Sequence, residues 1–215
     1  MTYTVYAPQP GPRLFNGQLT QYMSENLIVN SLVPDVDGDS RADLVLVTPG
    51  ADGVYSSPQY VPLIRHGRAD GTFSASTPLV PFSLQISPGE VIDGDFNGDG
   101  RTDLILFGGL SNSGAGYQVL LNDGTGNFTA AGSGSLTSEP EPAVVGDFNH
   151  DGKLDFAVAQ NGPPPFSVFF GNGDGTFSAP SAMGTSSNGD PVLATAVDLN
   201  GDGYTDIVYM DSYVA

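Results

Sequence analysis

Four stretches of the chain carry aspartate or asparagine at alternate positions, directly before or within a run of apolar residues. They read DVDGDSRADLVLV (35–47), DFNGDGRTDLILF (95–107), DFNHDGKLDFAVA (147–159) and DLNGDGYTDIVYM (198–210). On a tightly curled loop, short side chains at alternate positions point their oxygens toward one centre, as in a site for a hard cation. Counted from the first aspartate, positions 1, 3, 5 and 9 are Asp35, Asp37, Asp39 and Asp43; Asp95, Asn97, Asp99 and Asp103; Asp147, Asn149, Asp151 and Asp155; and Asp198, Asn200, Asp202 and Asp206.

The remaining loop positions fit the same chemistry. Position 7 differs in type between loops, as expected where only the backbone carbonyl binds the ion; it is Arg41, Arg101, Lys153 and Tyr204. Glycine at positions 4 and 6 allows the positive φ that a tight curl needs, although Ser40 and His150 stand at two of these positions.

Oxygen-only ligation predicts calcium. The chain has no cysteine and no histidine at the ligand positions, which disfavours zinc, copper and iron. Calcium accepts six to eight oxygens in flexible geometry, whereas magnesium requires a tight octahedron. The loops differ from EF-hands, because position 12 is an apolar or aromatic strand residue in place of glutamate. We expect about four structural calcium ions per chain, one in each loop.

A simpler interpretation is that Asp-Gly and Asn-Gly pairs only form turns. That interpretation suffices for one loop. Four loops with their acids in the same register would hold several carboxylates within a few ångström, and these repel one another unless a cation neutralises them. We therefore interpret the loops as metal sites that pin the turn before each buried strand.

The loops belong to a repeat. Their first aspartates, Asp35, Asp95, Asp147 and Asp198, are separated by 60, 52 and 51 residues. A second phrase recurs between them, as GRADGTFSAS (67–76), NDGTGNFTAA (122–131) and GNGDGTFSAP (171–180). A period of this size is typical of propellers and solenoids.

Each period reads as four short strands, with the acidic loop between the first and the second. In the third repeat we expect strands at 142–148, 154–160, 166–172 and 175–183. The fold class is therefore all-β, a β-propeller of four-stranded antiparallel blades in a single domain over residues 1–215. The blade repeats span about 25–80, 88–137, 141–186, and 190–215 together with 1–24.

The last blade would lack two strands unless the N-terminal strands complete it. Phe15 precedes Asp35 by 20 residues, close to the spacing of Phe73, Phe128 and Phe177 from the loops that follow them. Joining the termini in one sheet would leave no bare edge. Four repeats can close as a four-bladed ring or pair as two chains in an eight-bladed ring, and a piece cut from a longer array is the alternative.

The repeats resemble the FG-GAP or VCBS-type repeat, which also builds the integrin α-subunit β-propeller. The resemblance rests on the acidic loops and on GNGDGTFSAP, and it covers residues 15–210. It implies a calcium-stabilised propeller of a secreted or cell-surface protein that binds proteins or glycans, related propellers being lectins. Integrin-type propellers have seven blades, so binding sites built by a particular set of their blades do not carry over to four repeats.

The composition limits the classes of partner that the chain is expected to bind. The formal charge of −18 disfavours nucleic acid and anionic membrane surfaces and favours cations. No apolar run is long enough to span a membrane, and the first residues show no signal peptide. His66 and His150 have no nucleophile in a recognisable motif, and the glutamates are not paired, so we expect no enzyme activity.

Tyrosines outside the repeat pattern are candidates for stacking on a sugar or anchoring a protein, although covering apolar edges is an equally good role for them. These candidates are Tyr55, Tyr60, Tyr117, Tyr204 and Tyr213. The alternatives to a binding module are an accessory domain of a secreted polysaccharide-active enzyme and a purely structural repeat assembly.

Overall fold

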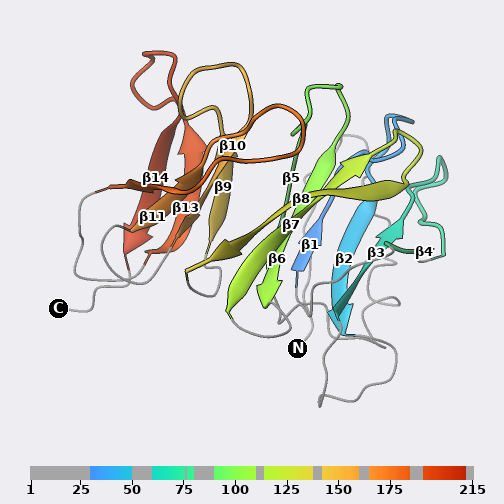
Figure 1. Ribbon diagram of the computed structural model, residues 1–215. Coiled ribbons are helices and arrows are strands. Elements are labelled where there is room, and N and C mark those ends of the chain that lie inside the picture. Colours follow the sequence, from blue (N-terminus) through green and yellow to red (C-terminus); the bar gives the residue numbers. More distant parts are fainter. Residues whose placement is uncertain are drawn as a thin grey trace.

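The computed structural model describes residues 30–49, 60–75, 77–79, 90–109, 114–137, 142–159, 165–184 and 191–211. Within these ranges the chain is all-β and contains no helix, and so none that could cross a membrane (Figure 1). The strands expected in residues 1–24 and the chain end after residue 211 lie outside the described residues.

The strands form four antiparallel sheets, each built in sequence order. The first sheet holds β1 (Asn30–Leu32), β2 (Leu44–Pro49), β3 (Tyr60–Arg65) and β4 (Thr77–Pro78). The second holds β5 (Val91–Gly94), β6 (Asp103–Gly109), β7 (Ala115–Asn122) and β8 (Phe128–Leu136). The third holds β9 (Ala143–Gly146), β10 (Asp155–Ala159), β11 (Phe166–Phe169) and β12 (Ser181–Met183). The fourth, as far as it is described, holds β13 (Pro191–Val197) and β14 (Asp206–Asp211).

The third sheet has the four strands that the sequence predicts, each shorter than expected, and the last differs most. The last strand was expected over 175–183 but β12 begins at Ser181. Before it, the chain makes only an isolated bridge between Gly171 and Phe177.

The first sheet shows the same delay with no proline before β4: Gly67 bridges Phe73, and β4 begins at Thr77. In both sheets a serine side chain accepts a backbone N–H at this point, Ser74 from His66 and Ser178 from Phe170. The second sheet has threonine there, and β8 runs on from Phe128.

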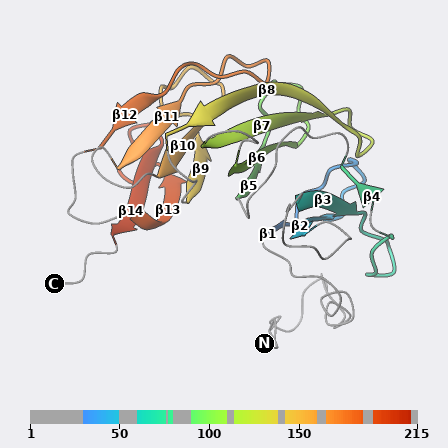
Figure 2. The same cartoon turned by 60° about the horizontal axis from the view of Figure 1, so that its bottom comes forward.

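The sheets follow one another along an arc, with the first strand of each on the concave side (Figure 2). β1 lies against β5, β5 against β9, and β9 against β13. The strands next to them, β6 and β10, are buried on both faces, from Leu104 to Phe107 and from Phe156 to Ala159. This explains why these strands read as continuous apolar runs instead of alternating apolar and polar residues.

Three apolar cores fill the spaces between neighbouring sheets. Between the first and second sheets, Val45 and Ile64 pack with Leu104. The core between the second and third sheets is aromatic, and the ring centroids of Tyr117 and Phe156 lie 5.0 Å apart at 71°. The third core joins β10 and β11 to side chains of β13 and β14. Its residues include Phe148, Ala157, Phe166, Val168, Ala196 and Ile207.

Position 2 of each acidic loop belongs to this packing between sheets. Val36, Phe96 and Phe148 are 0%, 2% and 9% exposed, because each inserts into the core shared with the following sheet. Leu199 holds the same position in the fourth loop and is 71% exposed. Among the described residues no sheet follows the fourth one, so its outer face keeps apolar side chains in solvent. These side chains are Val197, Leu199, Tyr204, Val208 and Met210.

Candidate metal-binding loops

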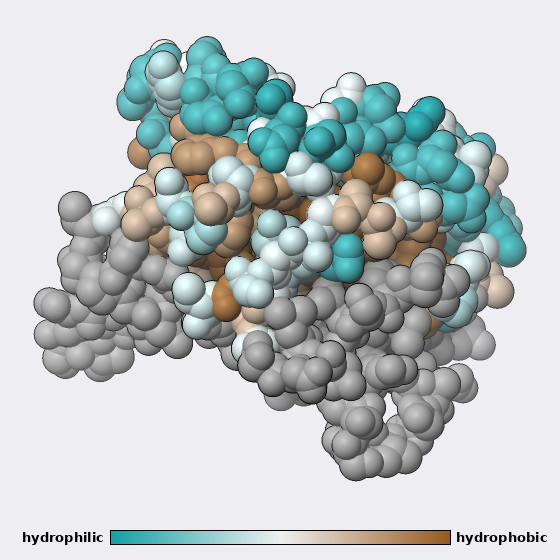
Figure 3. All heavy atoms as spheres, in the orientation of Figure 1, coloured by the Kyte–Doolittle hydropathy of each residue, from teal (hydrophilic) through white to brown (hydrophobic). Residues whose placement is uncertain are grey.

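The four acidic loops lie on one edge of the molecule. They join β1 to β2, β5 to β6, β9 to β10 and β13 to β14, and all four project at the top of Figure 1. Hydrophilic residues gather along the same edge in the space-filling view (Figure 3). Because each loop follows the first strand of its sheet, the repeat places every predicted site on the same side of the fold.

The carboxylate at position 9 anchors each loop and is buried in the first three. Asp43, Asp103 and Asp155 are 0% exposed. In each, Oδ2 accepts the N–H of position 2, at 2.8, 3.0 and 2.9 Å. Oδ1 accepts an N–H from the end of the third strand of the same sheet, at 2.8 Å in all three. In the fourth loop, Asp206 Oδ2 accepts the Leu199 N–H at 3.0 Å.

The carboxylates at positions 1 and 5 hold the curl of the loop. Oδ2 of position 1 accepts the N–H of position 6, at 2.8 Å in the first three loops and 3.0 Å in the fourth. Oδ1 of position 5 accepts the N–H of position 7, at 2.8–3.0 Å. Where position 3 is asparagine, its Nδ2 donates to Oδ2 of position 5, at 3.0–3.2 Å.

The backbone at positions 4 and 6 has positive φ in every loop, as the glycines predict. Gly98 and Gly100 have φ of 75° and 81°. His150 and Ser40 adopt the same conformation, at 60° and 66°, despite their side chains. The hydrogen bonds at positions 1, 5 and 9 therefore impose the curl even where the residue disfavours it.

These hydrogen bonds bring the predicted ligand oxygens together. In the first loop, carboxylate oxygens of Asp35, Asp37 and Asp39 lie within 4.8 Å of one another. The basic side chains at position 7 lie beside the acids: Arg41 pairs with Asp39, and Arg101 pairs with Asp99 at 3.1 Å. A set of short, convergent oxygen donors fits a hard cation.

Burial sets the protonation of the position 9 carboxylate. Burial in the sheet raises the pKa of Asp103 from 3.8 to about 6, the largest cause being loss of water around the charged form. Its two backbone hydrogen bonds partly oppose the rise, and the charges of Asp99 and Asp95 add to it. The pKa of Asp155 is raised for the same first reason. A cation beside these carboxylates would favour their charged form.

The first loop has a neighbour that the sequence analysis did not assign. His66, directly after β3, brings Nδ1 to 3.2 Å from Asp37 Oδ2 and 3.7 Å from Asp43 Oδ2. A ligand atom of each of these three side chains lies within 4.8 Å of the others. No histidine stands at the predicted ligand positions, and His66 reaches this loop from the end of β3, outside the loop sequence. Aligning LIRHG (63–67) with FFG (169–171) would have revealed a histidine at an otherwise apolar position.

The tyrosines are placed differently from the expectation. Tyr117 is 4% exposed within the aromatic core, so its proposed role in contacting a ligand is wrong. Tyr204 is 49% exposed, and its ring centroid lies 4.9 Å from that of His150 in the neighbouring loop. Tyr55, Tyr213 and the side chain of Tyr60 lie outside the described residues.

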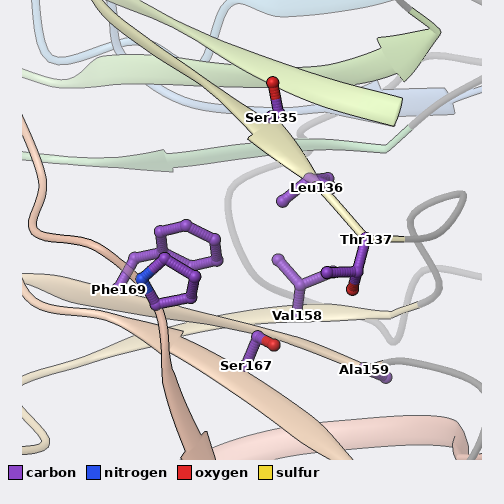
Figure 4. Close-up of a pocket in the computed structure, with 8 residues that line it drawn as sticks. Ser135, Leu136, Thr137, Val158, Ala159, Ser167 and Phe169 are labelled. Atoms are coloured by element: carbon purple, nitrogen blue, oxygen red, sulfur yellow. The ribbon is translucent and has the colours of Figure 1, made fainter. Parts of the chain in front are cut away.

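A small pocket opens between β8 and the strands β10 and β11. Leu136, Val158 and Phe169 converge there, while the Ser135 hydroxyl points away (Figure 4). Its lining holds no acid, base or metal ligand and offers no catalytic set; it consists of Ser135, Leu136, Thr137, Val158, Ala159, Ser167, Phe169 and Pro180.

The fold and the loops define an all-β repeat protein in which one acidic turn recurs in every sheet. The chain belongs to the FG-GAP-like repeat family, whose model matches residues 35–106, 95–158 and 147–209. Each match begins at one acidic loop and ends in the strand that follows the next acidic loop. Repeats of this family indicate a β-propeller-type binding or structural module. A comparison with curated proteins found no match.

The raised pKa of Asp103 predicts an unusual pH dependence for the metal-free protein. Between about pH 4 and pH 6 the folded state keeps a proton that the unfolded chain has released, so stability falls as pH rises through this range. For a shift from 3.8 to about 6 the loss approaches about 3 kcal/mol by pH 7. Urea unfolding of metal-free protein at about pH 4.5 and pH 7 measures it.

Asp103→Asn is the variant for this experiment. It is less stable at both pH values, because its amide sets an N–H against a backbone N–H. Its stability should nevertheless change less between them than that of the unmodified protein. A stability that rises with pH in the metal-free protein, by the same amount in both proteins, would contradict the assignment.

Proposed function

We propose that this chain is a non-enzymatic, calcium-stabilised β-propeller module that recognises a glycan or a protein outside the cell or at its surface. The observation that carries the proposal is the recurrence of one hydrogen-bonding scheme in all four loops, at positions 1, 5 and 9. Position 9 is buried in the first three loops, and its neighbours in every loop are acidic, so each loop concentrates negative charge that a cation would neutralise.

In the loops whose candidate ligand atoms are all oxygen, calcium fits the donors better than other ions do. The side chains at positions 1, 3, 5 and 9 and the carbonyl of position 7 would hold it. An extracellular calcium module binds at about 10⁻⁴ M, so about 1 mM calcium would add roughly 1.4 kcal/mol of folding stability per site. The proposed role of the ion is to hold each loop, and through it the sheet, in place.

Calcium should raise the melting temperature markedly, and a chelator should reverse the rise. Asp95→Asn removes a charged ligand from the second loop and should reduce the gain from calcium. Asp70→Asn is the matched control, since Asp70 holds a turn between β3 and β4 of the first sheet, where it accepts hydrogen bonds from Thr72. Calorimetry with calcium and with chelator measures the three proteins; an identical melt in both conditions would refute structural calcium.

The fourth sheet supports the propeller architecture, because among the described residues no further sheet covers its outer face. Leu199 repeats the buried position of Phe148 yet is exposed, which leaves the face of β13 and β14 ready for another sheet. In the other loops, Oδ1 of position 9 accepts an N–H from a third strand. We propose that the N-terminal strands, with Phe15, complete the last sheet, so that four blades close within one chain or eight within a homodimer.

Closure predicts that Leu199 is covered in solution. Leu199→Ala should then cost about 2–5 kcal/mol, the range for a buried leucine. Phe148→Ala in the third loop is the reference, since its side chain is 9% exposed. Urea unfolding gives both values, and native mass separates a 22.2 kDa monomer from a dimer of twice that mass. A monomer in which Leu199→Ala is neutral would argue against both rings.

The ligand class is tested on a glycan array probed with calcium and again with chelator. We expect specific binding that is lost with chelator, because the loops that present one edge of the module depend on the ion. Tyr204→Ala tests an exposed aromatic on that edge. Absence of binding in both conditions would contradict glycan recognition and favour a protein ligand, an accessory domain of a polysaccharide-active enzyme, or a structural assembly.

A further inference from the structure

His66 occupies a position that is apolar in the second and third sheets. In each of the first three sheets, one backbone N–H donates to Oδ1 of the buried aspartate at position 9. His66 is the residue directly before that donor in the first sheet. The donors are Gly67, Asn122 and Gly171, and the preceding residues are His66, Leu121 and Phe170. Leu121 and Phe170 pack against the cores shared with the next sheet, so histidine replaces a packing residue there.

The imidazole is held firmly in this position. Leu121 lies over Gly175 of the third sheet, where an added Cβ would come within 2.9 Å of its Cδ2. His66 lies in the same way over Gly126 of the second sheet, where an added Cβ would come within 2.5 Å of Cε1. Its own backbone N–H donates to Ser74 Oγ at 2.8 Å. The ring is therefore wedged between the first loop and the next sheet.

A second departure faces the first. Position 3 is aspartate in this loop and asparagine in the other three. Asn97, for example, donates its Nδ2 to Asp99, which Asp37 cannot do toward Asp39. Instead, Asp37 Oδ2 lies 3.2 Å from His66 Nδ1. Asp37 and His66, two points at which the first repeat departs from the second and third, thus meet each other.

Hydrogen bonding does not account for this contact. His66 Nδ1 is buried and has no hydrogen-bond partner, although two carboxylate oxygens lie at 3.2 and 3.7 Å. A proton on Nδ1 would leave this buried N–H with an ion-pair contact to Asp37 that lacks hydrogen-bond geometry. A lone pair on Nδ1 would face two negative oxygens. A cation between the three atoms removes both costs, and the second lone pair of Asp43 Oδ2 is available although this oxygen accepts the Val36 N–H.

We propose that the first loop is a mixed nitrogen–oxygen site that binds a divalent transition metal ion of the zinc or cobalt class through His66, Asp37 and Asp43. Imidazole nitrogen binds these ions well, whereas calcium prefers oxygen. The second, third and fourth loops keep asparagine at position 3 and remain calcium sites. The proposal rests on the loops holding cations and assigns a different ion to one of them.

Cobalt titration of the whole chain tests the site, in about 1 mM calcium to keep the other loops loaded. We expect the tightest Co²⁺ step to involve one ion per chain and to give a paramagnetically shifted imidazole N–H resonance. His66→Leu, which copies Leu121, should weaken this step at least about tenfold, the smaller loss seen when a metal site loses a supporting contact. Zn²⁺ should compete for the same site.

His150→Gly is the matched control, because it removes the other of the two histidines and suits the positive φ at that position. It should leave the Co²⁺ step and the shifted resonance unchanged. Equal Co²⁺ affinity in the unmodified protein and in His66→Leu, with no shifted resonance, would overturn the proposal and leave His66 as an ion-pair partner of Asp37.

The outcomes for the two proposals can be separated. A melt that calcium does not change would refute structural calcium in the oxygen-only loops, while the His66-dependent Co²⁺ step would still stand on its own. Calcium stabilisation without a His66-dependent Co²⁺ step would leave the calcium proposal intact and refute only the mixed site. His66→Phe, which copies Phe170, repeats the test if the leucine variant folds poorly.

Discussion

The fold depends on a buried carboxylate that, in each of the first three sheets, accepts two backbone N–H groups. In the second sheet, Asp103 ties the start of the loop, through Phe96, to the end of β7, through Asn122. A carboxylate can accept both bonds at once because each of its oxygens faces one donor. These two hydrogen bonds fix the loop to the third strand of its own sheet. Without this link, the curl would be a solvent-exposed turn with no fixed relation to the strands.

The same loop also joins one sheet to the next. Position 2 places its side chain in the core between sheets, and its backbone takes part as well: the Val36 carbonyl accepts the Asn122 amide at 2.7 Å, and the Phe96 carbonyl accepts the Gly175 N–H at 3.1 Å. The acidic side chains of the candidate metal site and the side chains that pack between sheets thus come from adjacent residues. Any change in the loop's curl moves the residue that packs on the next sheet, so loop order and the arc of sheets are coupled.

Much of this could be predicted from sequence, because the repeat supplies three or four copies of each signal. The antiparallel sheets, the loop between the first two strands and the positive φ at positions 4 and 6 follow from Asp, Gly and apolar spacing. Contacts between repeats could not be predicted in this way. Tyr117 looked irregular in sequence but fills the aromatic core, and His66 meets Asp37 only because β3 returns beside the loop. The late starts of β4 and β12 accompany Ser74 and Ser178, whose side chains accept a backbone N–H next to the bridge, a local detail that the strand pattern did not indicate.

Repetition also explains how one site can differ from its neighbours without loss of the fold. Each loop satisfies its own backbone through positions 1, 5 and 9, and these are aspartate in all four. Position 3 and the residue before the N–H donor to position 9 matter less for this bonding. The first loop has aspartate and histidine at these two positions and still makes the same hydrogen bonds through positions 1, 5 and 9. Position 3 and the residue that packs toward the next sheet differ between repeats, while positions 1, 5 and 9 do not. A repeat protein of this kind can therefore hold its sheets with several similar loops while one loop acquires a different ligand set.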